Sequence, residues 1–275
     1  MMTGQPMIGP MPQMGYGTWE RREHACHACV STALEVGYRH IDTAQGYDNE
    51  EFVGAAIAES GLNREEVFVT TKVAPVNYGA GRVLPSVRKS LDKLRLDKVD
   101  LLLLHWPSPH DEYPVATYVE QLAEALDAGL ATHIGVSNFT KRHLDAALAI
   151  LGDRPILTNQ CEIHVYLQNR VIVDYCAQRD IPMTAYCPMA RGRIIGDPVL
   201  GEIADRHGGT VGQVALAFLM AQGHVVIPSS SSAARIAENF GALDLSLGFS
   251  EITRLRGLER GERLVNGDWV PVWDD

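Results

Sequence analysis

Long apolar runs are absent from this chain of 275 residues. No segment approaches the roughly 18 consecutive apolar residues that a membrane-spanning helix requires. The first segment, Met1–Pro10, lacks the charged and then apolar order of a signal peptide, so we expect a cytoplasmic protein. No linker-like segment divides the chain, and 46% of its residues are apolar. We therefore predict a single domain over residues 1–275, with an irregular tail at about residues 261–275.

Positive charge is scarce in the sequence. There are 24 Lys and Arg residues against 34 Asp and Glu residues, which gives a formal net charge of −10. Nucleic acids and anionic membranes repel such a surface, so we expect neither as a partner. Local basic residues can still bind small anions.

Cysteine is also rare. Five cysteines, an odd number in a long chain, indicate free thiols rather than a disulfide framework. The segment HACHAC (24–29) raises the alternative of a metal or redox site, but no second ligand pair follows at a suitable spacing. Helical spacing places Cys26, Val30 and Ala33 on one face. We therefore predict structural cysteines and no metal site.

Apolar runs alternate with amphipathic helical patterns from end to end. Eight strands, each followed by a helix, are typical of an α/β fold of the (β/α)8 TIM barrel type, and a doubly wound open sheet is the alternative. The predicted strands are Met11–Gly15, Tyr38–Asp42, Val67–Lys72, Val99–His105, Thr132–Ser137, Leu157–Cys161, Met183–Tyr186 and Val225–Pro228. The predicted helices cover 23–36, 50–60, 80–94, 117–128, 140–151, 169–179, 199–222 and 233–243, with an extra helix over Ser250–Arg260.

Polar residues follow the predicted strands at their C-terminal ends. Barrel enzymes carry their active sites on the face where these ends converge. In an open sheet, the ends of eight successive strands would not meet, so the distribution favours the barrel. The residues at these ends are Asp42, Lys72, His105, Ser137, Asn138, Gln160, Tyr186, Ser229 and Ser230.

The segment HIDTAQGYDNE (40–50) combines a strand end, a turn and a helix start. Asp42 ends the strand, and Tyr47 lies in the turn. Asp48 and Glu51 have the spacing of a capping box, which predicts a helix beginning at Asn49. Asp42 and Tyr47 therefore belong to a strand-to-helix loop, where α/β folds place their chemistry.

Short motifs occur in a fixed order along the chain: GYGTW (15–19), DTAQGYDNE (42–50), TTK (70–72), LLHWP (103–107), GVSNF (135–139), NQCEIHVY (159–166), AYCP (185–188), IPSS (227–230) and RIAEN (235–239). In this respect the sequence resembles the aldo-keto reductases from Gly15 to the C-terminus. It looks most like the bacterial branch that includes 2,5-diketo-D-gluconate reductases. The resemblance implies reduction of a small aldehyde, dicarbonyl or keto-sugar acid with NADPH, and the catalytic residues Asp42, Tyr47, Lys72 and His105.

The chemistry of these four residues fits carbonyl reduction. Hydride transfer leaves an alkoxide, which a general acid within hydrogen-bond reach must protonate. Tyrosine is a weak acid, with a pKa of about 10, so we expect the Lys72 ammonium to lower the pKa of Tyr47 while Asp42 holds the ammonium in place. His105 can orient or polarise the carbonyl oxygen. Each residue alone has an ordinary structural explanation, but four suitable residues on strand ends argue against chance.

The dinucleotide fingerprint is incomplete, because GYGTWE (15–20) lacks its third glycine, and no P-loop is present. The resemblance implies that the cofactor lies extended over the barrel face. Ser137, Asn138 and Gln160 would bond its carboxamide, and Tyr186 would stack on its nicotinamide ring. Helix capping and core packing are the alternatives. The full implied set is Gly17, Thr18, Trp19, Asp42, Ser137, Asn138, Gln160, Tyr186, Cys187, Met189, Ile227, Ser229, Ser230, Arg235, Glu238 and Asn239.

A hydroxyl-rich turn, 229–232, leads into a predicted helix. Free backbone N–H groups at a helix start suit a phosphate, and Arg235 can add a bidentate contact. The resemblance implies that the 2′-phosphate of NADP binds here, with Glu238 and Asn239 near the adenine. Many family members have lysine where this chain has Ser229, so we expect a weaker preference for NADPH, with NADH still the poorer cofactor. An ordinary serine loop is the alternative.

By the same resemblance, Trp19, Tyr78 and Trp106 form the aromatic walls of the substrate pocket, with Tyr47 and His105 at the carbonyl. Core packing is the alternative for the three aromatic walls.

The roles of three further segments are less clearly indicated by the sequence. Arg191 and Arg193 could hold a phosphate or an anionic substrate, or could be surface charges. The tail, with Trp269 and Trp273, could cover the pocket or pack on the outside of the barrel. Met1–Pro10 is too short for the full hairpin that closes the barrel bottom in many family members.

Two other functions compete with the reductase. A Schiff-base aldolase would use Lys72 as its nucleophile, but such a lysine needs a lowered pKa and Asp42 would keep it charged. A non-catalytic NADP-binding regulatory subunit is the second alternative, and the complete set of four catalytic residues argues against it. We predict a monomeric, NADP-dependent oxidoreductase acting on a small carbonyl compound.

Overall fold

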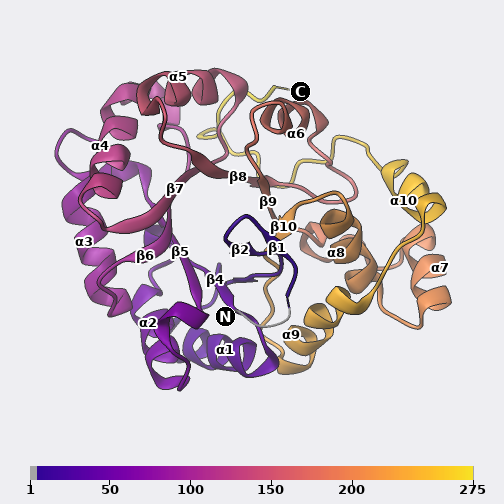
Figure 1. The fold of residues 1–275 in the computed structure, drawn as a ribbon. Helices are drawn as coiled ribbons and strands as arrows, with labels where there is room; N and C mark the ends of the chain where they lie inside the picture. Colours follow the sequence, from indigo (N-terminus) through magenta and orange to yellow (C-terminus); the bar gives the residue numbers. More distant parts are fainter. Residues whose placement is uncertain (1–4, 275) are drawn as a thin grey trace.

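The computed structural model describes residues 5–274, and these form a curled sheet of eight parallel strands with helices around its outside (Figure 1). Two short strands, β1 (Met7–Ile8) and β2 (Met11–Pro12), lie outside this sheet. The eight strands of the sheet are β3 (Tyr16–Gly17), β4 (His40–Asp42), β5 (Phe68–Val73), β6 (Val99–Leu104), β7 (Ala131–Ser137), β8 (Ile156–Glu162), β9 (Met183–Tyr186) and β10 (Val225–Val226). The helices are α1 (Glu23–Val36), α2 (Glu50–Glu59), α3 (Val83–Leu94), α4 (Val115–Asp127), α5 (Lys141–Leu151), α6 (Arg170–Ala177), α7 (Pro198–His207), α8 (Val211–Ala221), α9 (Ala233–Phe240) and α10 (Phe249–Arg256).

The strand order in the sheet is the order in the chain, from β3 to β10. The two outermost segments also meet, because Gly15 N donates to Val226 O at 2.8 Å and Val226 N donates to Gln13 O at 2.9 Å. A parallel bridge joins Met14 to Val226. This architecture is consistent with a (β/α)8 barrel.

Glycine is required where the outermost segments meet. A Cβ on Gly17 would lie 2.9 Å from Ile227 O, and one on Gly15 would lie 2.8 Å from the His40 ring. The two glycines of the GYG segment therefore permit close packing of backbone and ring. Barrel packing therefore accounts for both glycines without a glycine-rich dinucleotide motif.

A small hairpin plugs the centre of the ring of strands. β1 and β2 pair antiparallel, with Ile8 opposite Met11, and lie in the middle of the ring in Figure 1. The predicted first strand, Met11–Gly15, was wrong, because its first two residues belong to this hairpin and the barrel strand is β3. The N-terminal segment is thus long enough for a hairpin of two residues per strand, although residues 1–4 of the predicted Met1–Pro10 segment lie outside the described part.

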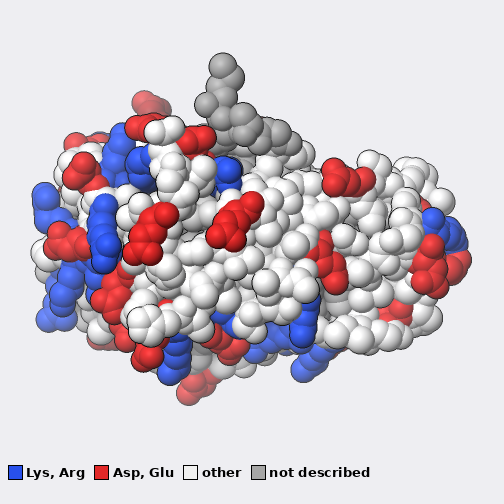
Figure 2. All heavy atoms as spheres, turned by 90° about the horizontal axis from the view of Figure 1, so that it is seen from below, with Lys and Arg blue, Asp and Glu red and all other residues white. Residues whose placement is uncertain are grey.

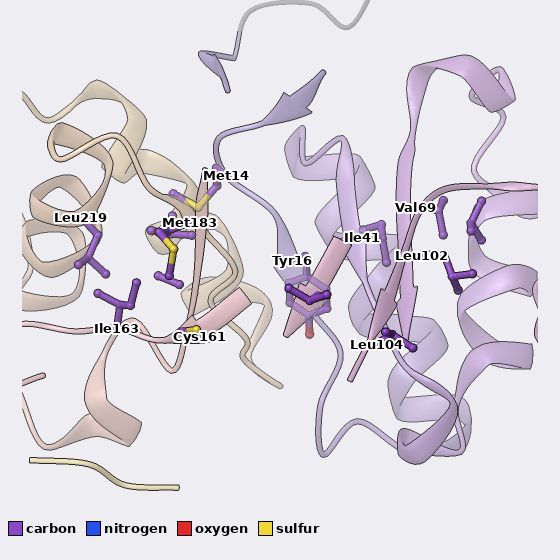
Figure 3. Packing of buried hydrophobic residues seen from close by; sticks show 14 of the residues in the cluster. Met14, Tyr16, Ile41, Val69, Leu102, Leu104, Cys161, Ile163, Met183 and Leu219 are labelled. Carbon is purple, nitrogen blue, oxygen red and sulfur yellow. The ribbon is translucent and has the colours of Figure 1, made fainter. Parts of the chain in front are cut away.

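Apolar side chains separate into two groups on the faces of the strands. Alternate residues of a strand point to opposite faces, so Leu101 and Leu103 pack inside with Met11 and Phe68. The larger group lies between the sheet and the helices. Figure 3 shows Ile41, Val69, Leu102 and Leu104 on one side of this group and Ile163, Met183 and Leu219 on the other.

Most helices match the predicted ranges. On α1, Cys26, Val30 and Ala33 are buried as predicted, and Cys29 is buried with them. The single helix predicted over 199–222 was wrong. Gly208 takes a left-handed conformation, φ 61, and ends α7, and a new capping box then begins α8.

The surface carries mixed charge. On the face drawn in Figure 2, basic and acidic side chains of the described residues are interspersed. Within residues 5–274, no helix has both the length and the apolar character needed to cross a membrane.

Candidate functional site

Four polar side chains from β4, the following turn, β5 and the end of β6 meet at one place. Lys72 Nζ lies 2.5 Å from Asp42 Oδ1 and donates to Thr43 O at 2.9 Å. It also lies 3.3 Å from the Tyr47 hydroxyl. The Tyr47 and His105 rings are 5.4 Å apart between centroids in an edge-on arrangement. The four predicted catalytic residues are therefore neighbours in space.

Burial dominates the protonation of this group. It raises the pKa of Tyr47, although the Lys72 ammonium acts to lower it. Burial acts to lower the pKa of Lys72, but the Asp42 carboxylate and Tyr47 outweigh it and the net pKa is raised. Burial and the Lys72 charge hold the pKa of His105 well below its usual value. At neutral pH the group thus has a protonated phenol, an ammonium and a neutral imidazole. The predicted lowering effect of Lys72 on the Tyr47 pKa is present, but desolvation exceeds it, so the net pKa is raised.

Tyr47 is carried by a 3-10 turn, Gln45–Tyr47, between β4 and α2. The Gln45 side chain secures this turn, because its Oε1 accepts from Ala74 N at 2.9 Å and from Asn77 Nδ2 at 2.8 Å. The turn is thereby tied to the segment that follows β5, and β5 is the strand that carries Lys72. This link holds the phenol near the ammonium.

The helix after this turn begins one residue later than predicted. Asn49 precedes α2, and its Nδ2 donates to Thr18 O at 2.9 Å instead of capping the helix. Asp48 is left-handed, with φ 52, and contacts Lys93. The capping box predicted from Asp48 was therefore wrong, because this side chain points to the surface.

A chain of hydrogen bonds links the next three strand ends to Asp42. Gln160 Nε2 donates to Asp42 Oδ2 at 2.8 Å, and Ser137 Oγ donates to Gln160 O at 2.8 Å. Asn138 Nδ2 donates to Ser137 Oγ at 2.9 Å. Tyr186 OH donates to Asn138 Oδ1 at 2.8 Å. These contacts form a continuous polar arc from β4 to β9.

A cavity of about 730 Å³ opens along this arc. Three of the predicted residues do not line it, namely Lys72, Thr18 and Tyr78. Lys72 is buried behind Tyr47, and Thr18 is buried with its Oγ1 donating to Asp42 O. The predicted residues that line the cavity are Gly17, Trp19, Asp42, Tyr47, His105, Trp106, Ser137, Asn138, Gln160, Tyr186, Cys187, Met189, Ile227, Ser229, Ser230, Arg235, Glu238 and Asn239.

Tyr78 has a different place from the one predicted. Its side chain is fully buried and stacks on Tyr118 with centroids 4.3 Å apart. Its hydroxyl donates to Trp106 O at 2.7 Å. Core packing, the alternative for this residue, is therefore correct, and Tyr78 acts on the cavity only by supporting Trp106.

The far end of the cavity lies at the start of α9. Ser229, Ser230 and Arg235 line it there, and the Ser232 side chain accepts from Arg235 N. Tyr16 OH donates to Ser230 O at 2.7 Å, which fixes the turn. Arg235 is exposed. The end of the cavity thus has hydroxyls, a helix start and a guanidinium, which together suit an anion.

The loop after β9 and the C-terminal tail supply residues that sequence reasoning left open or missed. The Arg191 guanidinium lies 4.9 Å from the centre of the Trp19 ring at the cavity, whereas Arg193 pairs with Glu262. The tail contributes Val265 and Trp269 to the cavity lining, and Trp269 packs edge-on against Trp106 with ring centroids 4.5 Å apart. No local pattern marks the missed lining residues, which are Glu20, Gly46, Pro188, Gly192, Ile194, Ile195, Thr210, Val211, Gly212 and Val265.

Comparison with known proteins gives this site its context. The Aldo/keto reductase family matches residues 13–260. Methylglyoxal reductase DkgB of Yersinia pestis is 44% identical over 265 residues, which cover 96% of this chain and 99% of that protein. A crystal structure provisionally named as a 2,5-diketo-D-gluconic acid reductase B has a TM-score of 0.92 and 40% identity, covering 96% of this chain and 94% of that one. The aldose reductase of Schistosoma japonicum has a TM-score of 0.88 and 31% identity, covering 94% and 95%.

These likenesses extend over nearly the whole chain and confirm the resemblance drawn from its motifs. They support carbonyl reduction as the class of reaction. The chain belongs to the aldo/keto reductase family and is an oxidoreductase.

Proposed function

We propose that this protein reduces a small aldehyde, dicarbonyl or keto-sugar acid to the alcohol with NADPH, and that Tyr47 is the general acid. The observation that carries the proposal is the contact of the Tyr47 hydroxyl with Lys72 Nζ at 3.3 Å beside the His105 ring. NADPH supplies the hydride when it is bound. The chain's own residues have to orient the carbonyl, exclude water and donate one proton.

Proton donation would come from Tyr47 Oη. The raised pKa keeps this phenol protonated at neutral pH, so the proton is available when negative charge develops on the substrate oxygen. Lys72 would then stabilise the phenolate that remains, and Asp42 holds Lys72 in position. Neutral His105 can donate a hydrogen bond to the same oxygen.

The donor and acceptor set of the arc fits a nicotinamide. Among residues 5–274, no hydrogen-bond donor reaches Gln160 Oε1, although this side chain faces the cavity. That oxygen can accept from an amide NH2, while Ser137 and Asn138 offer a hydroxyl and an amide. Tyr186 offers an aromatic face of the kind that stacks on a ring.

The far end of the cavity suits the adenosine 2′-phosphate of NADP. Arg235 can form a bidentate contact with it, and Ser229 and Ser230 can donate hydrogen bonds. Glu238 and Asn239 line the neighbouring wall and would lie near the adenine. Because Ser229 is uncharged, we infer a moderate preference for NADPH, with NADH as a weaker cofactor.

The substrate would occupy the aromatic end of the cavity. Trp19, Trp106 and Trp269 line it close to Tyr47 and His105. Aromatic walls with a few polar groups are typical of sites for small molecules. The name methylglyoxal reductase, carried by similar proteins, favours a short dicarbonyl compound.

The two alternative functions have less support. A Schiff-base lysine must be neutral to attack a carbonyl, whereas the Lys72 ammonium is buried in contact with Asp42 and its pKa is raised. A non-catalytic cofactor-binding subunit would not need a phenol, an ammonium and an imidazole together at the cavity wall.

We also infer a closed (β/α)8 barrel with its active site at the C-terminal face of the strands, supported by the hydrogen bonds between residues 13–15 and Val226. A single domain over 1–275 is supported by the eight-stranded sheet that runs without interruption from β3 to β10, with residues 1–4 and 275 lying outside the described part. Monomeric state and cytoplasmic location stay predictions.

The test is a panel of aldehydes and ketones, including methylglyoxal, followed by the loss of NADPH absorbance. We expect NADPH oxidation with short dicarbonyls. A parallel borohydride treatment would trap a covalent adduct on Lys72 if the protein were an aldolase. Adduct formation without NADPH oxidation would overturn the proposal.

A further inference from the structure

We propose that Glu162 is a positioning residue that fastens the C-terminal tail over the substrate end of the cavity. This inference deepens the proposed function and rests on it. Glu162 lies at the end of β8, two residues after Gln160, and does not itself line the cavity. Its role would be to place residues of the tail that do.

The Glu162 carboxylate is buried and binds the tail through its backbone. Leu264 N donates to Oε1 at 2.7 Å, and Val265 N donates to Oε2 at 2.9 Å. These contacts join positions 102 and 103 residues apart in sequence. Two consecutive amides on the two oxygens of one carboxylate fix both the position and the direction of the tail.

His164 holds this carboxylate in place. Its ring is fully buried, and Nε2 lies 3.0 Å from Glu162 Oε1. Burial acts to raise the pKa of Glu162, but the hydrogen bonds from His164, Leu264 and Val265 outweigh it and the pKa is lowered. Glu162 is therefore ionised at neutral pH, and three donors surround it.

The fastened segment forms part of the cavity wall. Val265 lines the cavity next to the point of attachment, and Trp269 lines it four residues later. Trp269 packs edge-on against Trp106 with ring centroids 4.5 Å apart, and Trp106 directly follows His105. Moving the tail at Val265 would therefore move a side chain that faces the substrate.

The end of the tail has a separate attachment. Asp274 accepts from Lys141 N at 2.7 Å at the start of α5, and Arg263 lies over the Trp273 ring. In Figure 1 the yellow C-terminal segment ends beside α5 and α6. The part of the tail that lines the cavity is thus held at one end by Glu162 and at the other by the backbone of Lys141.

The change Glu162→Gln tests this role. A glutamine has one acceptor oxygen, and its NH2 group would face a backbone N–H, which leaves one buried amide unsatisfied. We expect the KM for methylglyoxal to rise roughly tenfold, while the Kd for NADPH changes less than about twofold, because Trp269 and Trp106 line the end of the cavity proposed for the substrate. The matched control is Glu202→Gln, a carboxylate on α7 that pairs with Arg206 and Arg254 away from the tail.

A double-mutant cycle with Trp269→Ala separates positioning from general damage. If Glu162 acts by placing Trp269, each single change raises KM and the double variant raises it little further. An unchanged KM in Glu162→Gln, or effects that multiply in the double variant, would overturn the inference.

Amide hydrogen exchange gives a readout that does not depend on activity. We expect protected amides at Leu264 and Val265 in the natural chain and in Glu202→Gln, and faster exchange in Glu162→Gln at an otherwise unchanged exchange pattern. Equal protection of these two amides in all three proteins would show that Glu162 does not hold the tail. If the protein oxidises NADPH with no carbonyl compound, the proposed function is wrong. Hydrogen exchange does not depend on activity, so it would still test the role of Glu162.

Discussion

Lys72 Nζ and Asp42 Oδ1 lie 2.5 Å apart, and the two side chains are 0% and 2% exposed. A buried ion pair is costly to form, since both charges lose their hydration. Here it has further partners, because Thr43 O accepts from the ammonium and Gln160 Nε2 donates to the carboxylate. The pair therefore connects the proposed proton donor, Tyr47, to the proposed nicotinamide contacts.

Breaking this pair should destabilise the fold. Asp42→Asn leaves the Lys72 ammonium buried without a counter-charge, and we expect the free energy of unfolding to fall by about 3–5 kcal/mol. The double variant Asp42→Asn with Lys72→Met should lose less than the sum of the two single changes. Urea unfolding measures both. The control Asp127→Asn removes an exposed pair with Arg154 and should leave the free energy of unfolding almost unchanged. Equal losses in Asp42→Asn and Asp127→Asn would contradict the prediction.

Tyr47→Phe should remove the proton donor. We expect kcat to fall by about 10²–10⁴-fold, because general acid catalysis contributes a factor of that size. NADPH affinity, measured by fluorescence titration, should stay the same. Tyr78→Phe is the matched control, since this phenol bonds Trp106 O outside the cavity. It should lower stability by about 1 kcal/mol while keeping most of kcat.

Ser229→Lys should strengthen the preference for NADPH. A lysine at the phosphate end of the cavity adds a charge-assisted hydrogen bond, and a gain of roughly 1.5 kcal/mol corresponds to about tenfold in affinity. The ratio of kcat/KM with NADPH to that with NADH measures the change. Ser231→Lys is the control, because Ser231 does not line the cavity. Comparable efficiency of the natural chain with NADH and NADPH would contradict the assigned phosphate site.

Stability should fall as the solution becomes acidic. Burial lowers the pKa of His224 to about 4, and burial together with Arg142 lowers the pKa of His143 to about 4. The unfolded chain takes up protons near pH 6.5 while the folded chain does not, so this stability is complete above pH 6.5 and is lost as the pH falls toward 4. Each histidine should contribute a loss of about 1 kcal/mol between pH 6.5 and 5.5.

Urea midpoints at a series of pH values measure this loss. His224→Gln should remove that residue's own share of the loss, about 1 kcal/mol between pH 6.5 and 5.5, because this side chain no longer titrates. A midpoint that is constant or rises on acidification would show that these histidines are accessible to protons in the folded state.

The alternation of apolar runs and amphipathic patterns was readable in the sequence because it is a local property. Strand periodicity and the polar residues that follow each apolar run placed Asp42, Lys72 and His105 at strand ends. The buried face of α1 could be read from the spacing of Cys26, Val30 and Ala33 in the same way. These features depend on neighbours within a few residues, which any sequence displays.

Other features depended on contacts between distant segments. Tyr78 follows β5 much as a pocket residue would, yet packing on Tyr118 buries it. The pKa of Tyr47 rises because the folded chain excludes water around it, although the sequence indicated only the opposing pull of Lys72. The tail meets the barrel at Glu162, which accepts hydrogen bonds from the amides of Leu264 and Val265, 102 and 103 residues further along the chain.

The sequence by itself therefore determined which chemical groups this protein carries and the order of its elements. Only the tertiary structure decided which of those groups face the cavity, how much water each retains, and where the tail lies. The physical reason is that periodicity and turn chemistry act between near neighbours in the chain, whereas desolvation and backbone pairing between remote segments exist only once the chain has folded.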